Sequence, residues 1–219
     1  MFDGAEQRSP DRKRGNLGDV SVLSGQVVSS KFVPGLGAAW KMDLSAAYAA
    51  GQQVARTVLH LHPGYVAVVD EAVLDRERAI SLRWHTCDRA EPDGHGNFMV
   101  HGKKAKVAAL VKSLGTSEAQ ISRHEHGYEF PYDRDRMGAV LEPRRESFIE
   151  AKLYGDRCWL LTLFSVTSLA AEDQVWVRSA AGWTMGEVRF FMGAKGSGFS
   201  SNRGELSLDC PWNSLPQVG

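Results

Sequence analysis

Residues 54 to 70 read VARTVLHLHPGYVAVVD, and this stretch decides the fold. From Ala55 to Leu61 every second residue is apolar or Thr, so an extended chain places these residues on one side and Arg56 and His60 on the other. Pro63-Gly64 then reverses the chain. The run 65–70 is apolar on both faces, which is typical of a central strand under cover. The stretch therefore predicts an antiparallel hairpin at the centre of a β fold.

Further strand signals follow along the chain. The segments with strand character are 80–85, 97–100, 105–111, 147–154, 158–166, 174–178 and 183–191. Gly155-Asp156 predicts a hairpin between the fourth and fifth of these segments, and Ala181-Gly182 predicts one between the last two. The only helix-like stretch, 45–53, is short and contains Gly51. Strands at this spacing predict an all-β antiparallel sandwich, one domain over residues 1–219 with a loop-rich lead-in over 1–20.

Composition excludes several classes of protein. The 219 residues include 26 Lys or Arg and 26 Asp or Glu, so the net charge is zero and a nucleic-acid partner is not expected. The basic run Arg12-Lys13-Arg14 is read as a solvated loop. Cys87, Cys158 and Cys210 lack a metal-binding spacing and are expected to be free thiols. No apolar run is long enough for a membrane span, and the first residues do not resemble a signal peptide.

Four segments resemble one enzyme family when taken together. They are Phe2 to Gln7 (FDGAEQ), Lys41 to Tyr48 (KMDLSAAY), the hairpin 55–71, and Trp84-His85-Thr86. Their order and spacing are similar to those in the C-terminal β domain of the heparinase II/III family of polysaccharide lyases. The resemblance covers roughly the first 90 residues, and beyond them only strand character agrees.

The resemblance implies a bacterial, periplasmic or secreted parent enzyme that cleaves an acidic, uronate-containing polysaccharide by β-elimination. In such a parent the β domain packs against an α/α toroid. The family's catalytic Tyr, His and His-x-His residues match no position of this chain, so no catalytic residue is carried over. A structural zinc is implied for the parent, and no cofactor is expected in this fragment.

Two histidine pairs have the spacing of metal ligands. His60 and His62, like His124 and His126, are two residues apart, so an extended chain turns both rings of a pair to one side. Zinc needs three or four protein ligands, and the sequence shows no third. We therefore expect solvated histidines and no metal.

Other residues are candidates for contacts with a saccharide. Arg83 is a candidate contact for the substrate. His85 lies beside it, opposite the core residue Trp84, where it can serve in proton transfer or simply in the structure. Arg56 is expected to pair with Asp70 or Glu71, the alternative being a substrate carboxylate. Trp212, in a loop-like segment, is the best candidate among the tryptophans for stacking on a sugar.

The sequence leaves three functions open. The first is a lyase β domain that forms one wall of the substrate cleft. The second is a stand-alone carbohydrate-binding module, which requires an exposed aromatic strip. The third is a purely structural β domain.

Overall fold

The computed structural model describes residues 2–3, 25–48, 51–86, 89–115, 117–127, 135–140, 145–193 and 195–209. These residues form two antiparallel β-sheets and one short 3-10 turn, so the predicted all-β antiparallel sandwich is confirmed. Within these ranges no helix has the length and apolar character that a bilayer crossing requires.

The larger sheet has eight strands in the order β1-β2-β3-β4-β8-β6-β5, with β7 also paired to β8. Its strands are β1 (Gln26–Val33), β2 (Gly37–Asp43), β3 (Gly51–Leu61), β4 (Tyr65–Thr86), β5 (Asn97–His101), β6 (Ala105–Ser113), β7 (Gln120–Gly127) and β8 (Arg145–Ser168). The hairpin predicted from residues 54–70 is confirmed as β3 and β4, with Arg56 opposite Asp70. Its second strand lies between β3 and β8, as its apolar faces predicted.

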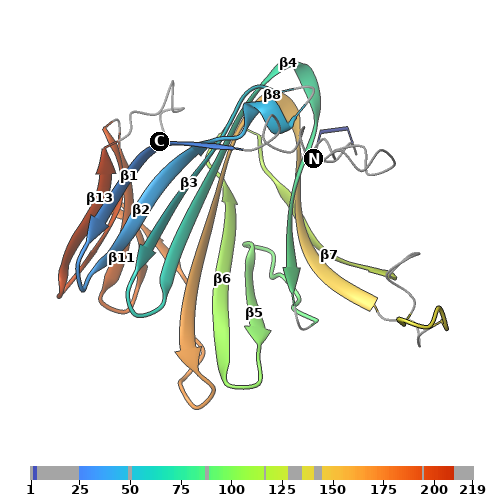
Figure 1. The fold of residues 1–219 in the computed structure, drawn as a ribbon. Coiled ribbons are helices and arrows are strands. Elements are labelled where there is room, and N and C mark those ends of the chain that lie inside the picture. The colour runs from blue at the N-terminus through green and yellow to red at the C-terminus, as the bar shows by residue number, and fades with distance from the viewer. Residues whose placement is uncertain are drawn as a thin grey trace.

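The smaller sheet has five strands in the order β13-β12-β11-β10-β9. These are β9 (Val177–Ser179), β10 (Gly182–Met185), β11 (Val188–Gly193), β12 (Gly196–Ser201) and β13 (Gly204–Asp209). The sheet covers one face of the larger one, and β13 contacts β1, β2 and β3 (Figure 1). Between the sheets lies an apolar core that includes Leu59, Leu161, Phe190 and Phe199, none of them exposed to solvent.

Two very long strands shape the rest of the molecule. Strands β4 and β8 pair along almost their whole length and arch over together, as Figure 1 shows. The register shifts between Val73 and Arg78 of β4, opposite the single residue Asp156 of β8. Beyond this bulge, β4 from Arg78, β8 up to Gly155 and β7 form what we call the arm. A second core, which includes Val111, Ile149 and Leu160, lies on the side of the large sheet away from the small one.

Three details of the strand prediction were wrong. Gly155-Asp156 is no hairpin turn, because 147–154 and 158–166 belong to the single strand β8 and the extra residues of the bulge are on β4. The segment 183–191 is two strands, since the chain turns at Gly186, where φ is +57°. The helix-like stretch holds only the 3-10 turn η3 (Ser45–Ala47), and β3 begins at Gly51.

Apart from Phe2 and Asp3, the expected lead-in 1–20 lies outside the described residues, as do Cys87, Cys210 and Trp212. Phe2 is buried and bridges to Ile80 of the arm.

Candidate functional site

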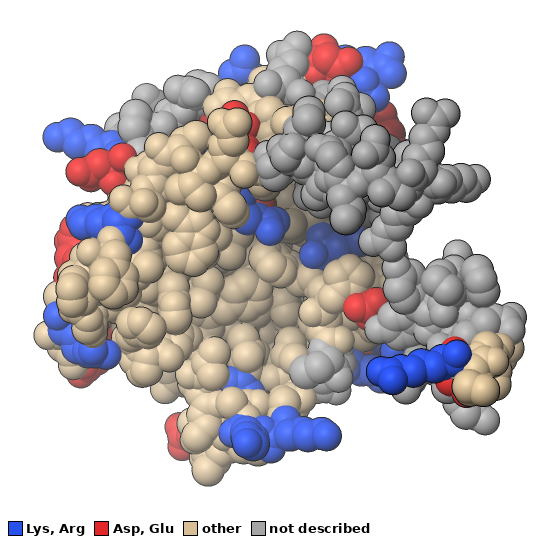
Figure 2. Space-filling model, viewed as in Figure 1, with Lys and Arg blue, Asp and Glu red and all other residues tan. Residues whose placement is uncertain are grey.

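The large sheet presents one face to the small sheet and a second face to the arm. We call the second the hollow face and define it by Trp40, Arg56, His60, Asp70 and Phe164, whose positions alternate with those of the sandwich core. Figure 2 shows the molecule hollowed near its centre, with a few Lys or Arg side chains inside the hollow.

Arg56 and Asp70 form an ion pair on the hollow face. Arg56 Nε donates to Asp70 Oδ1 at 2.7 Å, and the side chains are 31% and 18% exposed. Burial raises the pKa of Asp70, and the charge and hydrogen bond of Arg56 offset this only in part. Within the described part of the chain, Asp70 Oδ2 has no hydrogen-bond partner. The structure thus selects Asp70, not Glu71, as the partner of Arg56.

Trp84 connects the arm to this ion pair. Its indole N–H donates to Thr162 Oγ1 at 3.1 Å, and its ring meets Phe164 edge-on at 5.1 Å between centroids. The Arg56 guanidinium lies 5.4 Å from the centre of the same indole. The arm is therefore fixed over the hollow face by polar, aromatic and cation–π contacts at once.

Glu71 points the other way, into the sandwich, where Lys41 Nζ lies 3.0 Å from its Oε2. Their side chains are 9% and 1% exposed, so this pair is more buried than Arg56–Asp70. Sequence reasoning did not find it. The available signal was strand alternation, which puts Lys41 on the same side of β2 as Gly37 and Ala39, both buried.

His60 and His62 lie close together at the end of β3, with ring centroids 4.6 Å apart. Burial lowers the pKa of His60, and the neighbouring His62 lowers it further. The described residues bring no third metal-binding side chain to this pair.

The outer side of the arm carries a different set of residues, which we call the histidine face. It is defined by Arg83 and His85 of β4, His124 and His126 of β7, and Glu146, Phe148 and Glu150 of β8. Phe148 is buried beneath these polar side chains: His124 stacks on it at 5.3 Å, and the Arg83 guanidinium lies 4.9 Å from its ring centre.

Glu150 joins two residues of the histidine face. Arg83 Nε donates to its Oε1 at 2.8 Å, and His124 Nε2 lies 3.6 Å from its Oε2. Burial opposes ionisation of Glu150, but the hydrogen bond and charge of Arg83 outweigh it and lower the pKa of this carboxyl group. His124 Nε2 also lies 2.9 Å from Ser122 Oγ.

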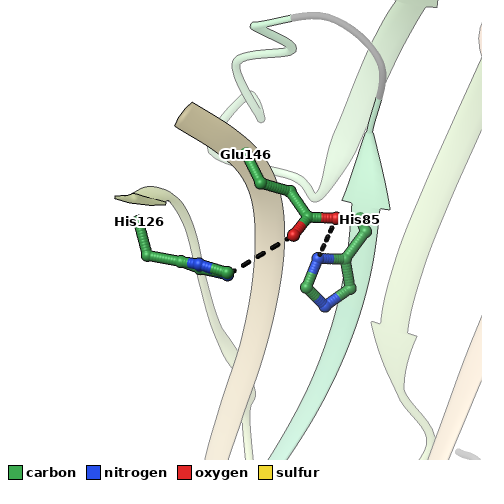
Figure 3. A group of neighbouring side chains, drawn as sticks. All are labelled: His85, His126 and Glu146. Atoms are coloured by element: carbon green, nitrogen blue, oxygen red, sulfur yellow. Dashed lines mark ion pairs between the residues drawn. The ribbon is translucent and has the colours of Figure 1, made fainter. Parts of the chain in front are cut away.

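A second carboxylate, Glu146, lies between two histidines (Figure 3). His85 Nδ1 is 3.0 Å from Glu146 Oε1, and His126 Nε2 is 3.5 Å from Glu146 Oε2. The ligand atoms of these three residues all lie within 4.8 Å of one another. The sequence pair His124/His126 is thus divided: His124 joins Glu150, and His126 joins His85 and Glu146.

The two arginines proposed from sequence as substrate contacts do not meet. Arg56 contacts Trp84 on the inner side of the arm. Arg83, the residue before Trp84 in the chain, turns to the outer side and contacts Phe148. One saccharide on either face would therefore reach only one of them. Trp212, the third proposed contact, is outside the described residues.

The described tryptophans give little stacking surface. Trp159, Trp176 and Trp183 are buried in the sandwich core, while Trp40 and Trp84 are partly buried. Cys158 is buried as a free thiol, and burial together with the charge of Asp70 raises its pKa to about 12.

No protein-family model matches the sequence, and no curated protein sequence matches it. The fold, by contrast, is similar to that of solved heparinases and a heparan sulfate lyase.

A heparinase III with methylated lysines matches with a TM-score of 0.58 and 10% identity, over 86% of this chain and 27% of that one. Heparan sulfate lyase HepC from Pedobacter heparinus matches with a TM-score of 0.54 and 10% identity, over 96% of this chain and 34% of that one. A further heparinase III gives a TM-score of 0.52 and 13% identity, over 84% and 27%. The fold is therefore that of a heparinase β region, as the sequence resemblance implied, and this chain spans about a quarter to a third of the lyases' length.

Proposed function

We propose that this chain is the C-terminal β-sandwich domain of a bacterial polysaccharide lyase, periplasmic or secreted, that cleaves an acidic, uronate-containing polysaccharide by β-elimination. One observation carries the proposal. The fold likeness extends over 84% to 96% of this chain yet covers only 27% to 34% of each lyase. The remainder of such an enzyme supplies the α/α toroid and the catalytic residues.

The hollow face is the surface that suits a cleft wall. The partly buried Trp40 is one of the residues that define this face, and two exposed apolar residues, Phe32 and Val166, lie on the same side of the sheet. Exposed apolar side chains on one sheet face suit a surface that packs against another domain. A toroid covering part of this face would bury them and would leave the remainder as a wall of the substrate cleft.

Arg83, which lies on the histidine face and so outside a cleft along the hollow face, is the residue that we propose for a second, separate saccharide contact. It is 32% exposed, and its Nε is held by Glu150 and its plane by Phe148, so the outer part of the guanidinium is fixed in orientation. A guanidinium presented in this way binds a carboxylate or sulfate with paired hydrogen bonds. His85, on the same face, is its neighbour in this role. Arg56 is assigned to the structure, through Asp70.

The test is binding of defined oligosaccharides to the purified chain, measured by calorimetry. We expect heparan sulfate, hyaluronan or alginate oligosaccharides to bind and neutral dextran not to bind. Arg83→Gln should weaken binding, whereas Arg189→Gln, an exposed arginine of the small sheet, should not. Equal loss in both variants would show nonspecific charge attraction and contradict the assignment of Arg83.

The coding sequence upstream of this chain gives an independent test of the parent enzyme. An open reading frame continuing from an α-rich domain with a His-x-His segment is the expected result. An unrelated upstream domain would contradict the proposed parent.

A stand-alone carbohydrate-binding module is the second candidate, favoured by Phe32 and Trp40 on the hollow face. Such a module binds through aromatic stacking, so neutral and acidic sugars would bind alike and Trp40→Ala would remove both.

A further inference from the structure

We propose that His85, His126 and Glu146 form a binding site for a divalent transition-metal ion, with zinc the expected metal. The proposed function requires no metal in this domain, so the inference goes beyond it. The three residues come from three neighbouring strands and place two imidazole nitrogens and one carboxylate on the same surface.

Strand register explains why these side chains meet. His126 of β7 lies directly opposite Glu146 of β8, so both leave the same face of the sheet. His85 of β4 lies opposite Phe148, two residues along β8 from Glu146 and therefore on that face too. Glu146 is on the central strand, and each histidine reaches its carboxylate from one side.

The donor atoms lie close to the separations that a zinc ion needs. Zinc–ligand bonds of about 2.0–2.2 Å at tetrahedral angles place neighbouring donor atoms about 3.3–3.6 Å apart. His85 Nδ1 lies 3.0 Å from Glu146 Oε1 and His126 Nε2 lies 3.5 Å from Glu146 Oε2, so each histidine faces a different oxygen of the carboxylate at close to this separation. No donor pair is further apart than 4.8 Å, a gap that small rotations of half-exposed histidine rings close.

Phe148 restricts where the rings can go. The rings of His85 and His126 pack on it, with centroids 5.5 and 5.6 Å from its own, and they meet each other edge-on at 6.0 Å. The buried Phe148 therefore supports both histidines from below. A site whose ligands are already held loses less conformational entropy when the ion binds.

The donor set selects the class of ion. Imidazole nitrogens suit zinc, copper and nickel, whereas calcium and magnesium take oxygen ligands. Two histidines and a glutamate leave one position for water, as in zinc sites with three protein ligands. His124 is not part of the set, because its Nε2 is directed to Ser122 and Glu150.

The experiment measures zinc binding to the full chain in a Cys87→Ser/Cys210→Ser background, which removes the thiols whose surroundings are not described. Dialysis followed by elemental analysis should give one zinc per chain, and calorimetry should give no binding of calcium or magnesium. His126→Ala and Glu146→Gln should each raise the Kd at least about tenfold. His124→Ala is the matched control on the same strand and should leave the Kd unchanged.

Imidazole proton NMR gives a second measurement, since the chain has seven histidines. Zinc should shift the signals of His85 and His126 and leave those of His60 and His62 in place. Circular dichroism without metal verifies that each variant folds. The proposal is overturned if no zinc binds, if His124→Ala weakens binding as much as His126→Ala, or if zinc shifts the His60 and His62 signals instead. No saccharide is present, so this result and the oligosaccharide result are independent.

Discussion

Replacing Arg56 with Met removes the charge that Asp70 depends on. Ion pairs cost about 3–5 kcal/mol to break when fully buried and contribute at most about 1 kcal/mol when exposed. Arg56–Asp70 is intermediate, with side chains 31% and 18% exposed and a bond of 2.7 Å. Asp70 Oδ2 already lacks a hydrogen-bond partner among the described residues, so the variant would leave both oxygens unpaired. We therefore expect a loss of about 2–3 kcal/mol in the free energy of unfolding at pH 7.

The pH dependence of this loss has a definite sign. Burial raises the pKa of Asp70 in the folded state, and removing Arg56 takes away the largest influence that opposes that rise. A folded-state pKa above the unfolded value means that the folded variant binds the proton more readily, so the variant regains stability as the pH falls through the folded-state pKa towards the unfolded value. The difference from wild type should therefore shrink on acidification.

Urea denaturation followed by tryptophan fluorescence measures the effect. The double variant Arg56→Met/Asp70→Asn should recover at least about 1 kcal/mol of the loss, because the unpaired carboxylate is gone. Arg189→Met, an exposed arginine of β11, is the control and should change stability by less than about 0.5 kcal/mol. If Arg56→Met matches that control, Arg56 is not structural and returns to the candidate saccharide contacts.

The more buried pair gives a comparison within the same molecule. Lys41→Met leaves Glu71, 1% exposed, without its ion-pair partner, so the loss should reach about 3–5 kcal/mol. If Lys41→Met lowers the free energy of unfolding by less than Arg56→Met does, burial does not determine which ion pair contributes more to stability.

Three further outcomes are expected. The isolated chain should release no unsaturated product from alginate, heparan sulfate or hyaluronan, followed by ultraviolet absorbance; turnover that disappears in His85→Ala would contradict this. In the Cys87→Ser/Cys210→Ser protein, the Cys158 thiol, whose pKa burial raises to about 12, should react with Ellman's reagent only after unfolding in urea; rapid reaction of the native protein would disprove its burial. Glu150 has a pKa below its ordinary 4.5, so its contribution to stability is present above that pH and is lost as the pH falls through the lowered folded-state value. The stability gap between wild type and Glu150→Gln should accordingly narrow in acid, and a gap independent of pH would count against the Arg83 interaction.

Local signals made part of the fold predictable. The hairpin of β3 and β4 could be predicted from the pattern of apolar residues before and after the turn at Pro63-Gly64. Both signals depend only on residues that are close together in the sequence. The same hairpin predicted a carboxylate partner for Arg56 but left Asp70 and Glu71 both open, and the register of β3 on β4 selects Asp70. The hairpin predicted at Gly155-Asp156 was wrong because the same residue types occur in hairpin turns and in bends within a strand. The bulge that distinguishes the two cases here is in β4, far away along the chain.

The histidine face could not be predicted from the sequence, because residues far apart in the chain form it. His126 could be recognised as one member of a spaced pair, but its partners His85 and Glu146 come from other strands. Only the register of β4 and β7 on β8 brings the three together. Sequence spacing had paired His126 with His124, whose ring the structure directs to Glu150.

The long pairing of β4 with β8 has a consequence for the rate of folding. Tyr65 pairs with Ser165 and Thr86 with Ser147, so partners in this ladder lie about 60 to 100 residues apart along the chain. Each such contact closes a large loop before it gains any stabilisation, and proteins dominated by non-local pairing fold in milliseconds to seconds. Because β8 also pairs with β6 and β7, three strands lack a partner until β8 is in place, and their unpaired edges are open to other chains until then. The chain should therefore be most prone to aggregate during refolding, before β8 is in place.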